Sequence, residues 1–353
     1  MRANPIFILF CLVLLVACTD GRNAVKLHTS QIFVFGTLVD ITFWDVDDAL
    51  REQVVAVISQ DFQRMHHEWH PWNPGPLLTL NQALARGEAA EAPDSLIPLI
   101  IQSRDLSAQS GGLFNPAIGS LLQLWGFQSS ERPQGPPPSA EMIAAWRGQA
   151  PAMTDLELDG RLLRSRNPAV QLDFGAYAKG YAVDVAISHL QQRGIDNAIV
   201  NAGGDLRAIG SKDGQPWRIG IQHPQGEQEK LYAWLDVSAG EAVFTSGNYR
   251  RYREDQGIRY SHILDPRTGM PVDGVTSVTV IHHSGAIADA AATALVVAGP
   301  EQWEATALAM GIDQVMLVDD GGVVYMSPKM QQRVHFQDAP AVLKISEAFA
   351  DEP

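Results

Sequence analysis

The chain has 353 residues, of which 46% are hydrophobic and 19% charged, proportions typical of a soluble globular protein. This length allows one large two-lobed domain or two smaller domains with cores of their own. The formal net charge of −14 argues against nucleic acid as a partner, because binding many phosphates requires a basic surface. It leaves open a phosphorylated small molecule held through a metal ion.

Residues 1–18 are predicted to be an export signal. Arg2 precedes an apolar run over 6–16, which is too short for a convincing membrane span and has the length of a signal-peptide core. The run ends in Leu-Val-Ala-Cys, which resembles the bacterial lipobox, where the cysteine is lipidated and becomes the mature N-terminus. A plain signal peptide with an incidental cysteine is the alternative. We expect an exported protein anchored to the membrane through Cys18, with 19–29 as a tether.

The first half of the mature chain is expected to combine strands and helices. Residues 28–45 alternate apolar and polar side chains and predict one strand, or two strands around Gly36. Apolar spacing over 48–70 predicts a helix, and a second helix is expected around 94–110. Residues 128–140 are rich in proline and predict a surface loop inserted within one domain.

The second half has denser patterns. Residues 169–194 predict a strand, a glycine turn and a helix that stops at Gly194, and 197–210 predict two strands around a glycine turn. Several strands follow, then an apolar helix over 286–299 and a hairpin over 312–327. We therefore expect a mixed α+β fold in which one domain covers 30–335 and 336–353 form a C-terminal tail.

An acid and a hydroxyl lie one turn apart in the apolar helix. Asp289 and Thr293 have i,i+4 spacing, which places both side chains on one helix face. Two oxygen ligands at this spacing suit Mg²⁺, which takes few protein ligands together with substrate phosphate oxygens. The pair also fits a simpler explanation, in which the threonine bonds back to its own helix and the acid interacts with the helix dipole.

Four other residues are candidates for chemistry. Asp173 precedes a glycine turn that opens a helix with Lys179 in its first turn, an arrangement that suits an anion, although helix capping by the acid explains much of it. His262 is the best general-base candidate, with a structural hydrogen bond as the alternative. Trp72 offers an aromatic plane for stacking.

Seven segments, in this order, resemble the successive blocks of the ApbE family, the FAD:protein FMN transferases. They cover about residues 30–330 and read FGTLVDI, GLFNPAIGSLLQLWGF, DFGAYAKGYAVD, NAGGDLRAIG, TSGNYRRY, HILDPRTGMPV and ADAAATALVVAG. The resemblance implies an ApbE-type two-lobed fold, with largely antiparallel sheets flanked by helices and the active site in a cleft between the lobes. Many members are lipoproteins, in agreement with the lipobox.

The resemblance also implies roles for particular residues. Mg²⁺ would bind Asp289, Thr293 and the backbone carbonyl of Ala176, and His262 would accept or orient the proton of the acceptor hydroxyl. The residues implied to contact FAD are Phe35, Trp72, Leu113, Phe114, Asn115, Asp173, Lys179 and Ile263. Two of these depart from the family pattern, since Phe35 replaces the usual methionine and Asn115 the usual acid.

The implied activity is transfer of the FMN part of FAD to a Thr or Ser hydroxyl of a target protein, with release of AMP. The same residues fit hydrolysis of FAD to FMN and AMP, and a lipoprotein that only binds flavin is the third possibility. By family analogy, the acceptor is an exported domain of a membrane redox complex, and the protein acts on the periplasmic side of a bacterial membrane.

Overall fold

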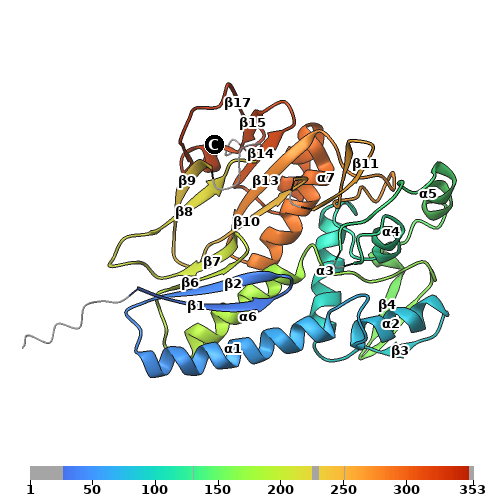
Figure 1. The fold of residues 1–353 in the computed structure, drawn as a ribbon, viewed down its shortest axis with the longest axis horizontal. Helices are drawn as coiled ribbons and strands as arrows, with labels where there is room; N and C mark the ends of the chain where they lie inside the picture. Colours follow the sequence, from blue (N-terminus) through green and yellow to red (C-terminus); the bar gives the residue numbers. More distant parts are fainter. Residues whose placement is uncertain (1–26, 130, 225–229, 250, 350–353) are drawn as a thin grey trace, which may run out of the picture.

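The structure is a computed structural model that describes residues 27–129, 131–224, 230–249 and 251–349. Within these residues, nine strands form one large sheet (Figure 1). In spatial order they are β1 (Leu27–Val34), β2 (Thr37–Trp44), β6 (Ala198–Ala202), β7 (Asp205–Ile209), β10 (Ala242–Gly247), β13 (Val275–His282), β14 (Val315–Asp319), β15 (Val323–Met326) and β17 (Val342–Ile345).

Neighbouring strands of this sheet are antiparallel except β15 and β17, which are parallel. The described part of the chain has three smaller antiparallel sheets. They contain β16 (His335–Phe336), β9 (Leu231–Val237) and β8 (Trp217–Gln222); β3 (Ala90–Glu91), β5 (Leu162–Ser165) and β4 (Leu156–Asp159); and β11 (Tyr252–Asp255) with β12 (Ile258–Ser261).

The helices come from all parts of the described chain. They are α1 (Asp48–Glu68), α2 (Pro76–Ala85), α3 (Ile97–Gln109), α4 (Gly119–Leu124), α5 (Ala140–Arg147), α6 (Ala178–Gln192), α7 (Gly285–Ala309) and α8 (Pro328–Gln331), with a 3₁₀ turn at Met153–Asp155. The fold class is therefore the mixed α+β class that was predicted. Among these helices, none is both long enough and apolar enough for a membrane crossing.

The central strands of the large sheet are buried on both faces. Phe244 packs into the core that the sheet shares with α1, α6 and α7, whereas the adjacent Val243 faces a second core formed with β8 and β9. Leu317 and Val318 of β14 divide between the two cores in the same way, because successive strand residues point to opposite faces. A third, smaller core lies around α4 and α5.

Several predicted elements are present. The helix expected over 48–70 is α1, whose N-terminus is capped by the Asp47 carboxylate. Gly36 joins β1 to β2 with a φ of 72°, and Gly194 follows α6 with the same φ, the left-handed conformation that glycine adopts without strain. In the proline-rich segment, the described residues before Ala140 form no helix or strand; residue 130 is not described.

The structure differs from the predicted boundaries at both ends. Strand β1 begins at Leu27, so 27–29 belong to the sheet and not to a tether. The segment predicted as a tail after 335 contributes β17, which extends the sheet beside β15. Helix α2 was not predicted; it starts at Pro76, directly after the proline- and glycine-rich turn that masked its onset.

Candidate active site

Helix α7 carries the predicted metal-binding pair, and its start is capped from two directions. The Ser284 hydroxyl accepts the Ile287 N–H at 3.3 Å. The carboxylate of Asp184, which belongs to α6, accepts the N–H groups of Gly285 at 2.8 Å and Ala286 at 3.1 Å. The helix therefore begins against α6. At its expected end, Gly299, the backbone is not helical (φ 69°, ψ 178°), and a second helical segment follows this kink to Ala309.

Asp289 is buried, with 4% of its surface exposed. Its Oδ2 accepts the N–H of Gly180 at 3.0 Å, one of the first N–H groups of α6 that lack a partner within their own helix. Burial raises the pKa of Asp289 to about 6; Lys179 opposes this rise and Asp205 adds to it. The surrounding protein thus compensates the negative charge of this carboxylate only in part.

Thr293 does not show the back-bonding that the simpler explanation requires. Its hydroxyl lies 3.2 Å from the Ser246 hydroxyl at the end of β10. Thr306, further along the same helix, does bond back, to the Gln302 carbonyl at 2.9 Å. The acid and the hydroxyl of the pair therefore face neighbouring elements, α6 and β10.

Two glycines allow α6 and α7 to approach closely. A Cβ added at Gly180 would lie 2.2 Å from the Gly285 carbonyl oxygen, and one added at Gly285 would lie 2.8 Å from the Gly180 carbonyl oxygen. This crossing brings Asp289 to the first turn of α6. Ala176, the third predicted ligand, is half-buried in the turn that precedes this helix.

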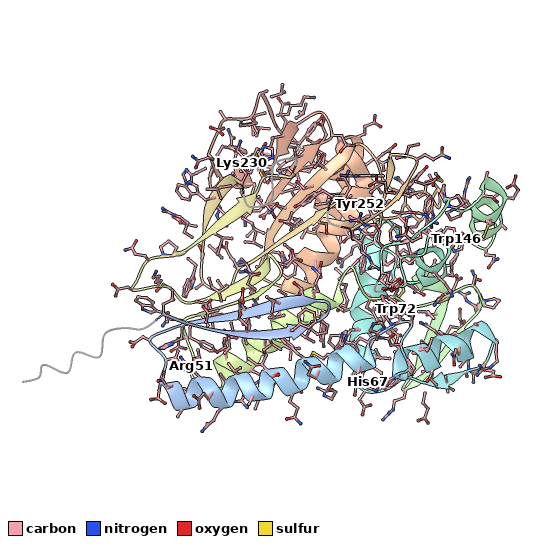
Figure 2. The ribbon with its side chains drawn as sticks, in the orientation of Figure 1. Arg51, His67, Trp72, Trp146, Lys230 and Tyr252 are labelled. Carbon is pink, nitrogen blue, oxygen red and sulfur yellow. The ribbon has the colours of Figure 1, made fainter. Side chains whose placement is uncertain are left out.

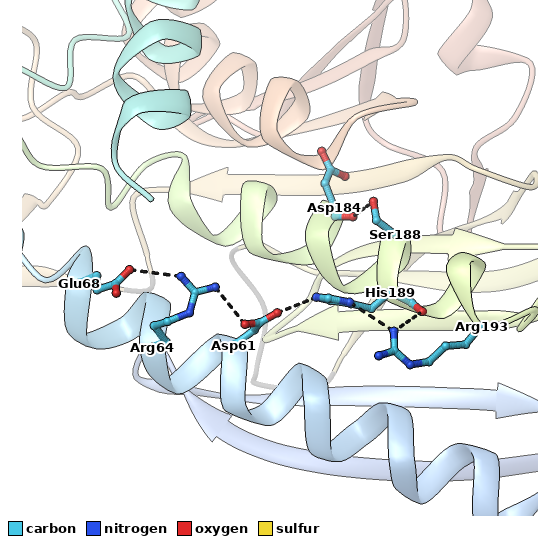
Figure 3. A network of polar contacts seen from close by, with 7 residues as sticks. All are labelled: Asp61, Arg64, Glu68, Asp184, Ser188, His189 and Arg193. Carbon is cyan, nitrogen blue, oxygen red and sulfur yellow. Dashed lines mark hydrogen bonds and ion pairs between the residues drawn. The ribbon is translucent and has the colours of Figure 1, made fainter. Parts of the chain in front are cut away.

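Helix α6 is also fixed against α1, by the polar network shown in Figure 3. His189 Nε2 of α6 lies 2.6 Å from the Asp61 carboxylate of α1, and Arg64 donates to the same carboxylate at 2.9 Å. Burial alone would raise the pKa of Asp61, but the hydrogen bonds from Arg64 and His189 lower it. Helix α6 is thereby held near its C-terminal end by α1 and at its first turn by α7.

Two predicted FAD contacts lie at the start of α6: Asp173 precedes the helix, and Lys179 is part of its first turn. Asp173 is buried; its Oδ1 accepts the Gly175 N–H at 2.9 Å, and its Oδ2 accepts Gln128 Nε2 at 3.1 Å. Burial raises the pKa of Asp173 in spite of these two bonds. Lys179 donates from its ammonium group to the carboxylate of Asp205.

The sequence analysis did not single out Asp205. It begins β7 directly after the turn at Gly203 and Gly204, and only 2% of its surface is exposed. Besides Lys179, its carboxylate accepts the N–H of Thr245 at 2.9 Å. The available signal was an acid that directly follows paired glycines at the end of an apolar strand.

His262 is connected to Asp173 through residues 127–128, which contact both of them. Its Nδ1 is 2.9 Å from the Arg251 carbonyl oxygen, and its ring centroid is 6.3 Å from that of Phe127. Because a carbonyl only accepts, the neutral imidazole carries its proton on Nδ1 and its lone pair on Nε2. Gln128, the residue after Phe127, donates to Asp173. Ile263 is buried, and its carbonyl accepts the Val272 N–H at 2.9 Å.

The predicted FAD contacts Phe35 and Trp72 lie at the ends of neighbouring elements. Phe35 occupies the turn between β1 and β2 with a φ of 54°, and its ring is parallel to that of Trp69 at 6.5 Å. Trp72 lies beyond the end of α1 (Figure 2), with its ring centroid 4.3 Å from that of His70.

Segment 113–115, another predicted FAD contact, is largely buried. Leu113 and Phe114 are buried in the main core, and the Phe114 ring centroid is 6.0 Å from that of Tyr177. Asn115 donates from Nδ2 to the Pro151 carbonyl at 3.0 Å and accepts the Ala117 N–H at 3.1 Å. The next two residues bind the segment that leads to Asp173: the Pro116 carbonyl accepts the Asp173 N–H at 2.9 Å, and the Ala117 carbonyl accepts the Gln171 N–H at 3.2 Å.

Comparison with known proteins gives a consistent result. A sequence model of the ApbE family matches residues 35–316. A FAD:protein FMN transferase of Rhodobacter capsulatus is 44% identical over 311 residues, covering 87% of this chain and 58% of that protein. One from Escherichia coli strain K12 is 29% identical over 335 residues, covering 90% of this chain and 93% of that protein.

Solved structures have the same fold. The ApbE protein of Thermotoga maritima superposes with a TM-score of 0.79 at 30% identity, covering 89% of this chain and 100% of that one. The flavin transferase ApbE of Vibrio cholerae gives 0.76 at 29% identity, covering 88% and 99%. The large sheet and its flanking helices thus form an ApbE-type fold. The chain belongs to the ApbE family, as its seven sequence blocks predicted. It spans little more than half (58%) of the Rhodobacter relative.

Proposed function

We propose that the chain is a Mg²⁺-dependent FAD:protein FMN transferase. An acceptor Thr or Ser oxygen would attack the phosphorus atom of the FMN half of FAD. A phosphoester bond to the acceptor forms, the pyrophosphate P–O bond breaks, and AMP leaves. The observation that carries the proposal is the buried Asp289, directed at the first turn of α6, with the Thr293 hydroxyl one turn along.

The donor groups at this place fit Mg²⁺. They are a carboxylate whose charge is incompletely compensated and hydroxyl groups on Thr293 and Ser246, all of them hard oxygen ligands. No group of three or more His, Cys, Asp and Glu side chains is placed to hold a metal in the described part of the chain. Asp289, Thr293 and the Ala176 carbonyl would hold the ion, which would polarise the pyrophosphate and stabilise charge on its oxygens.

The remaining side chains would bind and orient the two reactants. The Lys179 ammonium and the positive end of the α6 dipole favour an anion at the helix N-terminus. His262, with its lone pair on Nε2, would accept the proton that the acceptor hydroxyl loses. Phe35 and Trp72 would pack against the ring systems of FAD.

Mass spectrometry of a candidate acceptor tests this proposal. Purified protein is incubated with FAD, Mg²⁺ and the acceptor, and the intact acceptor mass is measured together with free FMN and AMP. An acceptor heavier by one FMN, with AMP released, is the expected result. Free FMN and AMP with an unmodified acceptor would instead favour hydrolysis, and intact FAD would favour simple binding.

We also propose that the protein is a lipoprotein on the periplasmic side of a bacterial membrane, where it modifies an exported domain of a membrane redox complex. The support is the lipobox at Cys18, which lies outside the described residues, and the analogy with the family. Changing Cys18 to Ser should move the protein from the membrane fraction to the soluble periplasmic fraction. An unchanged distribution would argue against lipid anchoring.

A further inference from the structure

The ammonium group of Lys179 acts electrostatically on the proposed metal site, since it opposes the rise in the pKa of Asp289. Lys179 directly precedes Gly180, whose N–H binds the Asp289 carboxylate. A fixed positive charge at this position repels a divalent cation, and the repulsion is strong where the surroundings exclude water. If the Lys179 ammonium and a divalent cation both bind one pyrophosphate, a negatively charged group is needed to reduce the repulsion between them.

Asp205 is placed to do this. The exposed fractions of the Lys179 and Asp205 side chains are 30% and 3%, so their ion pair is largely shielded from solvent. The other oxygen of Asp205 accepts the Thr245 N–H at 2.9 Å, which fixes the carboxylate to β10. The next residue, Ser246, has its hydroxyl 3.2 Å from that of Thr293.

The charges around the site support the same conclusion. When ionised, Asp289, Lys179 and Asp205 carry a net charge of −1, so a single divalent cation makes the group positive toward a pyrophosphate. Without Asp205, the charges of Asp289 and Lys179 would sum to zero, and the metal ion would bind to a neutral group. Asp184, the other nearby acid, is already bonded to Arg207 at 2.8 Å and to the start of α7.

We propose that Asp205 is a positioning residue that neutralises the Lys179 ammonium, so that a divalent cation and this ammonium can lie side by side against the substrate. This inference rests on the proposed metal site. It assigns Asp205 a role toward Lys179 and not as a ligand of metal or substrate; its two oxygens bind the Lys179 ammonium and the Thr245 N–H.

Calorimetric titration of FAD-free protein with Mg²⁺ alone tests the proposal. Asp205→Asn should weaken Mg²⁺ binding by about tenfold or more, because the ammonium is then uncompensated. Adding Lys179→Met to this variant should restore the affinity to within about threefold of wild type, which a merely structural role of Asp205 would not allow. Lys179→Met alone should bind Mg²⁺ more tightly than wild type, and this arm does not depend on how well Asp205→Asn folds.

The matched control is Asp313→Asn, which removes one carboxylate from an exposed pair with Lys329, at 2.6 Å, outside the site. It should leave Mg²⁺ affinity unchanged. Wild-type affinity in Asp205→Asn, or no recovery in the double variant, would overturn the role of Asp205 while the metal site stands. Absence of Mg²⁺ binding by the wild type would instead overturn the metal site of the proposed function, and this inference with it.

Discussion

Replacing Asp289 by asparagine tests the buried carboxylate on which the proposed metal site depends. Burial raises the pKa of Asp289 from 3.8 to about 6. A rise of about 2 pKa units corresponds to about 3 kcal/mol of free energy spent on keeping the group ionised in the folded protein. Asparagine is neutral, and its amide oxygen can still accept the Gly180 N–H, so the variant should lack this cost.

The expected pH dependence follows from the direction of this shift. Because the pKa of Asp289 is higher in the folded protein than in the unfolded chain, the folded state binds more protons between about pH 4 and pH 6. The free energy of unfolding of the metal-free wild type should therefore fall by up to about 3 kcal/mol as the pH rises through this window. Asp289→Asn should remove this contribution and be the more stable protein above it.

Urea unfolding across this pH range, with and without Mg²⁺, measures the effect. Mg²⁺ binds the ionised carboxylate, so it should stabilise the wild type above about pH 6 and leave Asp289→Asn unchanged. Asp313→Asn, which removes an exposed carboxylate, serves as the control. The reasoning would be refuted if wild type and Asp289→Asn had parallel pH profiles, or if Mg²⁺ stabilised both equally.

Three further substitutions probe the site. Thr293→Val keeps the side-chain shape but removes the hydroxyl, so the transfer rate at limiting Mg²⁺ should fall by about tenfold or more, and a Mg²⁺ titration in which the rate stayed normal would contradict this. His262→Gln should lower kcat by about 10²–10⁴-fold with little change in the KM for FAD; steady-state kinetics showing the reverse split would point to a binding role. Gly180→Ala places a Cβ 2.2 Å from the Gly285 carbonyl and should cost about 1–3 kcal/mol or more in thermal unfolding. Gly148→Ala, at a φ of −62° with its nearest contact at 3.5 Å, should stay within about 1 kcal/mol and is the matched control.

Elements with a strong local pattern were predicted well. Helix α1 follows its apolar spacing, and the turns at Gly36 and Gly194 lie where glycine alone adopts a positive φ without strain. These features depend on a few neighbouring residues, so the sequence contains all the information they need. Helix α2 was missed because the proline and glycine residues before it have the same local signature whether they form a loop or start a helix.

Elements stabilised by distant parts of the chain could not be predicted in this way. Strand β17 has hydrophobic residues that are largely exposed, and it is a strand because β15 offers it an open sheet edge. Leu113 and Phe114, whose predicted contact with FAD stays a prediction, are buried in the main core, and this burial depends on the packing of the helices around them.

The amino-acid sequence by itself was sufficient to establish the family, the order of most elements and the one-turn spacing of Asp289 and Thr293. That spacing is a property of a single helix. The electrostatic surroundings of the pair depend instead on where α6 crosses α7, because this contact joins Gly180 to an acid 109 residues away. The same crossing brings Lys179 next to Asp289, with Asp205 as its counter-charge, and no local pattern encodes that arrangement.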